Sequence, residues 1–137
     1  MNHNQRVALF AGGLLLVACG TAYSSDWVSM GESGGQEYSL DRSSILNAGN
    51  SRKVWMKMVM KPHSIRGQGS SSKTWVTYVL AHMVFDCKEE TQATELLKAY
   101  FEDGTNDTSP MYVQGPQPVA PDTANRQMLD YVCAFKR

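Results

Sequence analysis

The longest run of β-branched and aromatic residues in the chain extends from Thr74 to Cys87 and contains no glycine or proline. This composition favours a β-strand. Because successive side chains of a strand point to opposite faces, one face would be nearly all apolar and the other mixed. The apolar face comprises Trp75, Thr77, Val79, Ala81, Met83, Phe85 and Cys87, and the mixed face Val76, Tyr78, Leu80, His82, Val84 and Asp86. We expect this strand at the centre of an antiparallel sheet, with its apolar face on the core.

The cleanest alternation of apolar and polar residues lies at positions 53–61. One face carries Val54, Met56, Met58 and Met60, and the other carries Lys53, Trp55, Lys57, Val59 and Lys61. This pattern predicts a half-buried antiparallel strand. We expect the methionines to fill the core, since methionine adapts to irregular gaps, although a metal-binding methionine cluster is an alternative. The candidate binding face is Lys53, Trp55, Lys57 and Lys61, which would be solvated or bind an acidic partner or a glycan.

Several shorter elements complete the predicted fold. Trp27–Met30 would begin the sheet as an edge strand, Glu37–Leu40 would form a second short strand, and Asp41 would cap one helical turn. A final helix is expected from Asp122 or Thr123 to about Phe135. Its apolar stripe would be Met128, Leu129, Val132 and Cys133, which packs the helix on the sheet. The fold class is therefore α+β, a small antiparallel sheet with a C-terminal helix packed on it.

Two segments in the second half of the chain are ambiguous. Residues 89–102 have helical spacing, and propensity slightly favours a helix. The same residues could form a strand whose inner face is Leu97, Ala99 and Phe101. Residues 114–121 contain three prolines and are expected to be an extended connection.

The N-terminus has the pattern of an export signal. A polar segment with one arginine precedes an apolar run from Val7 to Ala18, which is short for a membrane span and typical of a signal peptide. The run ends in Leu16-Val17-Ala18-Cys19, which resembles the lipobox of bacterial lipoproteins. That resemblance implies cleavage after residue 18, palmitate-type acylation and a diacylglycerol thioether at Cys19, and delivery to the outer membrane. Residues 19–25 would then be a lipid-anchored tether and 26–137 the folded domain. An ordinary signal peptide with an unmodified cysteine is the alternative.

The number of cysteines agrees with lipidation. The chain has three, and an odd number in an exported protein needs an explanation. If Cys19 carries lipid, Cys87 and Cys133 remain as one pair in an oxidising compartment, where we expect a disulfide. Two free buried thiols are the alternative.

Charge and motifs exclude several classes of function. The 137 residues contain 13 basic and 13 acidic side chains, so no long-range field favours nucleic acid. No nucleophile elbow and no cluster of ligands with metal spacing is present in the sequence. His82 shares a strand face with Tyr78 and Asp86, but about 13 Å of extended chain separates it from each. We therefore expect no enzymatic activity, no metal and no cofactor.

The order of these parts resembles the surface-adhesin protein E family of Gram-negative bacterial lipoproteins. The resemblance covers Trp27 to Cys133. It is carried by Trp27, Tyr38-x-x-Asp41, Val54-Trp55, Asp86-Cys87, the Pro118–Thr123 linker and Tyr131-Val132-Cys133. It implies a small antiparallel sheet with a C-terminal helix, a Cys87–Cys133 disulfide, and a strand at 89–102. The member that gives the family its name is an adhesin for host matrix proteins.

Two functional interpretations follow. The protein is a surface-exposed, adhesin-like binding module for a protein or matrix ligand, or it faces the periplasm as an inhibitor, immunity protein or envelope-assembly accessory. Both need a small disulfide-linked domain on a lipid anchor, so the fold does not separate them. In the second case residues 64–72 would be the loop that enters a partner's cleft.

Overall fold

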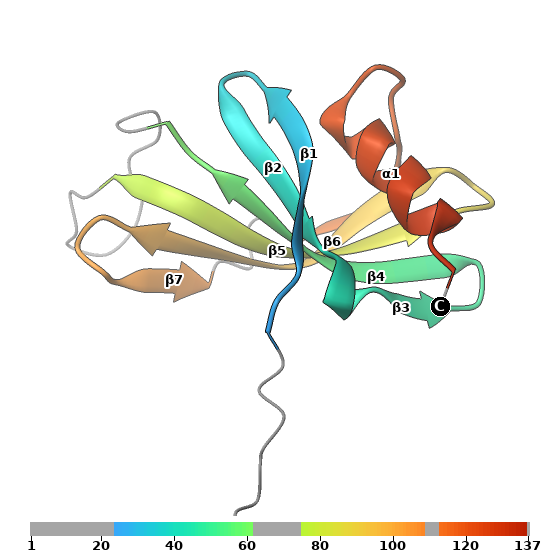
Figure 1. Cartoon of the computed structure of the whole chain (residues 1–137), viewed down its shortest axis with the longest axis horizontal. Helices are drawn as coiled ribbons and strands as arrows, with labels where there is room; N and C mark the ends of the chain where they lie inside the picture. The colour runs from blue at the N-terminus through green and yellow to red at the C-terminus, as the bar shows by residue number, and fades with distance from the viewer. Residues whose placement is uncertain (1–23, 62–74, 109–112, 137) are drawn as a thin grey trace, which may run out of the picture.

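The computed structural model describes residues 24–61, 75–108 and 113–136. These form one antiparallel sheet and a C-terminal helix, as expected for the predicted α+β class (Figure 1). The elements are β1 (Trp27–Ser33), β2 (Gln36–Asp41), the 3-10 turn η1 (Arg42–Ser44), β3 (Leu46–Ala48), β4 (Ser51–Val59), β5 (Val76–Asp86), β6 (Thr91–Phe101), β7 (Asn106–Thr108), β8 (Gln114–Pro118) and α1 (Ala124–Ala134). The predicted signal peptide, Cys19 and the 64–72 loop lie outside the described residues.

The central position of β5 is confirmed. The strand order is β1-β2-β4-β5-β6-β7, so β5 lies between the two longest neighbours, β4 and β6. Two short strands share the outer edge of β4, since β2 pairs with one half of it and β3 with the other. The outer edge of β6 is divided in the same way between β7 and β8. Apart from these short strands, β4, β5 and β6 form the body of the sheet.

One face of this sheet is covered by α1, and the alternating residues of β4 and β5 form the core there (Figure 1). The predicted core residues of the 53–61 strand are confirmed, because Val54, Met56 and Met60 are buried and Met58 is half-buried. The main core cluster is Met30, Leu40, Ile45, Val54, Met56, Ala81, Met83, Phe85, Val119, Met128, Leu129 and Val132. The methionines therefore act as core residues.

The start of β5 differs from the prediction. Val79, Ala81, Met83 and Phe85 are buried as expected, but Val76 is buried in place of Thr77. The cause is a shift in the pairing of β5 with β6 between Val76 and Tyr78. An irregularity of this kind changes which side chains face the core on one side of it.

Residues 91–101 are a strand, so the helix favoured by propensity is wrong and the strand implied by the family resemblance is confirmed. Leu97, Ala99 and Phe101 form the inner face, where they pack against a second small cluster of Met60, Val76 and Val79. Pairing with neighbouring strands on both sides outweighs an intrinsic preference of a few tenths of a kcal/mol per residue.

The proline-rich segment is also more regular than expected. Residues 114–118 pair with β6 as an edge strand, β8. Proline is compatible with this place because an edge strand leaves one row of backbone groups unpaired.

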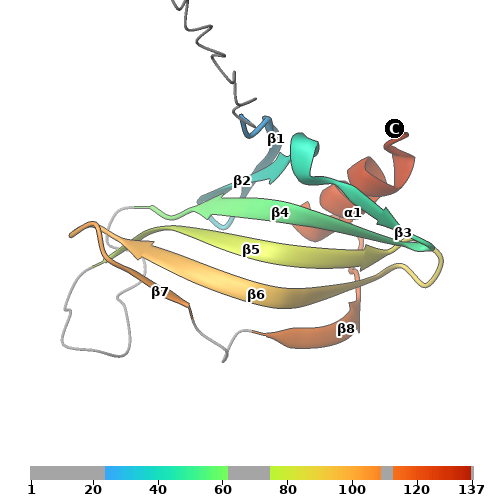
Figure 2. The same ribbon diagram turned by 90° about the horizontal axis from the view of Figure 1, so that it is seen from below.

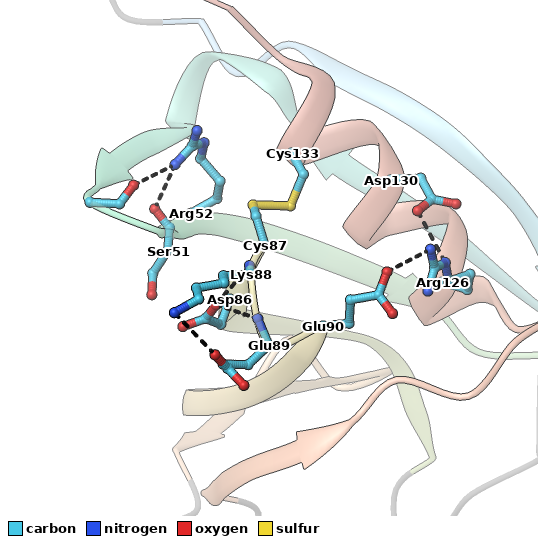
Figure 3. Close-up of a disulfide and its surroundings, with 11 residues drawn as sticks. Ser51, Arg52, Asp86, Cys87, Lys88, Glu89, Glu90, Arg126, Asp130 and Cys133 are labelled. Carbon is cyan, nitrogen blue, oxygen red and sulfur yellow. Dashed lines mark hydrogen bonds and ion pairs between the residues drawn. A yellow bond between two sulfur atoms is a disulfide. The ribbon is translucent and has the colours of Figure 1, made fainter.

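The C-terminal helix is fixed at both ends. Thr123 is its N-cap, and its hydroxyl accepts a hydrogen bond from the Arg126 backbone N–H at 3.1 Å. A disulfide joins Cys133 of α1 to Cys87, directly after β5, with an S–S distance of 2.04 Å (Figure 3). Near the N-terminal end of the helix, Arg126 forms ion pairs with Glu90 at 3.0 Å and with Asp130 at 3.1 Å (Figure 3). The predicted disulfide and helix are thus confirmed.

Candidate binding face

Among the residues that the structure describes, no helix covers the sheet face that lies away from α1 (Figure 2). We call this the open face, and it is built from the alternate residues of β4, β5 and β6. Residues paired directly across strands share a face, so the register gives its rows. The rows are Lys53–Val84–Ala93, Trp55–His82–Leu96, Lys57–Leu80–Lys98 and Val59–Tyr78–Tyr100. Aromatic and aliphatic side chains thus occupy the middle of the open face, between lysines.

The structure places the predicted binding residues as follows. Lys53, Trp55 and Lys57 lie on the open face, and Lys61 follows the end of β4, where its ammonium lies 3.8 Å from a carboxylate oxygen of Glu32. Three of the four residues therefore lie in line along β4, and Lys61 follows the end of that strand. Each lysine nevertheless has its own partner, which the sequence did not reveal.

Lys53 belongs to a three-residue cluster around Glu95. A bulge in β6 leaves Glu95 without a partner in β5, between Thr94 and Leu96. Its carboxylate accepts a hydrogen bond from Lys53 at 2.7 Å and lies 2.9 Å from His82 Nδ1. The hydrogen bond from Lys53 is the main cause that lowers the pKa of Glu95 below its ordinary value. This cluster links β4, β5 and β6 across the open face.

The cluster contains one pair of groups that also occurs in catalytic sites. A histidine beside a carboxylate is one half of the arrangement that activates a nucleophile. Within the described ranges, however, His82 makes no hydrogen bond to a serine, threonine or cysteine. Its ring also contacts that of Trp55, with 5.0 Å between the two ring centres. The same ranges contain no group of three residues that could hold a metal ion. The cluster is therefore best described as a polar link within the sheet surface.

Trp27 is the residue that the sequence analysis missed at this face. Lys57 Nζ lies 4.6 Å from the centre of the Trp27 ring, a cation–π contact. Two hollows adjoin the ring. One, of about 470 Å³, is lined by Trp27, Lys57, Val59, Thr77, Tyr78 and Leu80, and the other, of about 310 Å³, by Ser25, Trp27, Asp41, Trp55 and Leu80. Trp27 and Leu80 therefore form a shared wall.

The position of Trp27 depends on Asp41. Asp41 is only 7% exposed, and its Oδ1 accepts hydrogen bonds from the backbone N–H of Asp26 at 2.9 Å and of Ser43 at 3.0 Å. Arg42 strengthens this link, because its backbone N–H donates to Asp26 O at 2.8 Å and its guanidinium bonds the Asp26 carboxylate at 2.6 Å. The predicted N-cap of η1 thus also fixes the residue before Trp27. The Asp41 prediction was correct, but nothing local to it indicated this second role.

Residues 27–134 of the chain match one family model, described as Surface-adhesin protein E. The chain belongs to the surface-adhesin protein E family. Several solved structures of Haemophilus influenzae protein E have the same fold. For crystal form II the TM-score is 0.57 at 15% identity, with 71% of this chain and 80% of that chain covered. For protein E from non-typeable Haemophilus influenzae the TM-score is 0.56 at 14% identity, with 86% of this chain and 82% of that chain covered. No curated protein matches the sequence.

Family membership confirms the fold that the resemblance implied and supports an adhesin-like role at the cell surface, with a protein as partner. It also favours a binding protein over an enzyme. Within the described part of the chain, no helix has the length and apolar character needed to cross a membrane.

Proposed function

We propose that this protein is a lipid-anchored outer-membrane adhesin that binds a protein or matrix ligand through its open face. One observation carries the assignment of the surface. The core face of the sheet is covered by α1, whereas no helix of the described residues lies over the open face (Figure 2). The cross-strand register places half-buried tryptophan, tyrosine and leucine side chains there beside lysines. Exposed apolar patches with a polar rim mark interaction sites in soluble domains.

The anchor is proposed from the sequence. Cleavage before Cys19 and acylation of that residue would leave residues 19–25 between the lipid and the domain at 26–137. Each buried CH₂ of an acyl chain contributes about 0.8 kcal/mol, so several chains hold a protein stably on a membrane. The Cys19→Ser variant should lose incorporation of labelled palmitate and leave the membrane fraction. Incorporation that persists in this variant would contradict the anchor.

The surface location is tested by protease digestion of intact cells compared with cells whose outer membrane has been permeabilised. Digestion on intact cells is expected if the domain faces outward. Protection until permeabilisation would place the domain in the periplasm and refute the adhesin proposal. In that case the partner would be sought among the cell's own envelope proteins.

The binding surface is tested by adhesion of expressing cells to immobilised host matrix proteins. We expect Trp55→Ala to reduce adhesion, since its ring lies in the middle of the open face. Lys88→Ala is the control, because this exposed residue lies in the turn between β5 and β6, beside the disulfide (Figure 3) and beyond the last row of the open face. Equal adhesion of the wild type and the Trp55 variant, with equal amounts on the surface, would exclude this face.

A further inference from the structure

We propose that the hollow beside Trp27 binds an acidic peptide segment of the partner protein, in which one large apolar side chain has acidic residues near it. This inference rests on the proposed function and gives the chemical class of the ligand. It is drawn from the arrangement of one row of the open face and from the lining of the hollow.

The charges of this row are arranged around an apolar centre. Leu80 of β5 pairs with Lys57 of β4 on one side and with Lys98 of β6 on the other. Neighbouring strands lie about 4.8 Å apart, so the two lysines start roughly 10 Å from each other with the leucine between them. An apolar side chain placed over Leu80 would therefore have an ammonium group available on each side.

These two ammonium groups are not neutralised within the described part of the chain. Lys57 lies over the Trp27 ring and Lys98 lies 5.4 Å from the Tyr100 ring, and neither forms an ion pair there. Lys53 differs, because Glu95 already neutralises it. Of the carboxylates in the neighbouring rows, Asp41 accepts hydrogen bonds from the Asp26 and Ser43 backbone. Glu37 and Glu32 belong to the row of Val59, where Glu32 lies 3.8 Å from the Lys61 ammonium. The potential of the row is thus complementary to an acidic ligand.

The lining of the hollow favours a peptide over a glycan. Trp27, Val59, Tyr78 and Leu80 present mainly apolar atoms to a volume of about 470 Å³. Thr77 also lines it, and its hydroxyl already donates a hydrogen bond to the Tyr100 carbonyl at 3.0 Å. A sugar placed here would lose hydrogen bonds to water and find few in return, which is costly. An apolar side chain instead gains from the same surroundings.

The test measures binding of fluorescent probes to the purified full-length lipoprotein in mild detergent. The probes are a short peptide with a central leucine between glutamates, the same peptide with glycine for leucine, the same peptide with lysines for glutamates, and a heparin oligosaccharide. We expect the first to bind at least about tenfold more tightly than the others, a difference in Kd that separates specific from nonspecific contacts. Its affinity should fall as salt rises, since both lysines are only half-buried and their charges remain open to screening by ions.

The variants assign the binding to the row. Lys57→Glu, Lys98→Glu and Leu80→Ala should each weaken the acidic leucine peptide by about tenfold, while Lys88→Glu, with the same charge change elsewhere, should leave it unaltered. Leu80→Ala changes no charge, so it separates the apolar contact from the field of the protein.

The other outcomes overturn the inference. Preference for heparin would make the hollow a site for anionic glycans, and equal binding of acidic and basic peptides would show that charge does not select the ligand. Equal weakening by Lys57→Glu and Lys88→Glu would show that net charge is responsible. Absence of binding by every probe would refute the site, and the intact-cell digestion would still decide the adhesin proposal independently.

Discussion

Removal of the disulfide between Cys87 and Cys133 should cost a large part of the stability of the domain. The two cysteines are 46 residues apart, so the link closes a long loop of the chain. For a loop of this length the chain-entropy model gives about 4 kcal/mol of stabilisation at 25 °C. Domains of this size have roughly 5–15 kcal/mol in total. The double variant Cys87→Ser/Cys133→Ser should therefore fold but be much less stable.

The assay is urea unfolding of the full-length protein in mild detergent, followed by tryptophan fluorescence. With a slope of about 1.5 kcal/mol per M, a loss of about 4 kcal/mol lowers the midpoint by about 2.7 M. Reduction and alkylation of the wild type should lower it by a similar amount, since the entropy of the unfolded chain is what changes. Hydrogen exchange in α1 should increase most, because an 11-residue helix is marginal without tertiary contacts.

Two results would refute this reasoning. A decrease in the midpoint of less than about 0.5 M would show that the packing of α1 on the sheet stabilises the domain without help from the disulfide. A fall in the double variant that chemical reduction of the wild type does not reproduce would assign the loss to local packing around the serine side chains. The entropy of the closed loop would then not be the cause.

Three further changes test other parts of the structure by the same urea unfolding. Phe85→Ala should cost about 3–5 kcal/mol, since Phe85 is fully buried between the sheet and α1, and a cost below about 1 kcal/mol would contradict its central place in the core. Thr123→Ala should cost about 1 kcal/mol through loss of the N-cap, and Thr123→Ser should restore it. Glu95→Gln should cost less than about 1 kcal/mol because the pair with Lys53 is exposed. The lowered pKa of Glu95 means that its carboxylate favours the folded state at neutral pH, and this contribution should disappear as the pH falls from about 4.3 through the lowered pKa of the folded state. If the free energy of unfolding depends on pH in the same way for the Glu95→Gln variant and the wild type, that contribution is absent.

Alternation along single strands predicted most of the sheet. The side chains of β4 and β5 divide between two faces with a period of two, and that period survives through the middle of the sheet because these two strands pair without a shift in register. The prediction failed at Val76, where pairing with β6 shifts register. Bulges depend on the partner strand, so the sequence of β5 contains no signal for this one.

The strand at β6 shows the limit of propensity. Leucine, glutamate, lysine and alanine favour a helix in isolation, and the segment contains all of them. In the fold it lies between β5 and the short strands β7 and β8, and these partners supply hydrogen bonds that a helix would have made internally. The family resemblance predicted the strand correctly since it carries information about the whole fold.

The candidate site depends on residues from four strands, which explains why the sequence indicated only part of it. Along β4 the residues Lys53 and Lys57 are equivalent, since both lie on the same face. The bulge in β6 brings Glu95 to Lys53, whereas Lys57 faces Trp27 from the edge strand β1. One lysine is thereby neutralised and the other keeps its charge beside an apolar hollow. The difference between them arises from cross-strand register, so a structure was needed to separate a surface ion pair from a group that is available to a ligand.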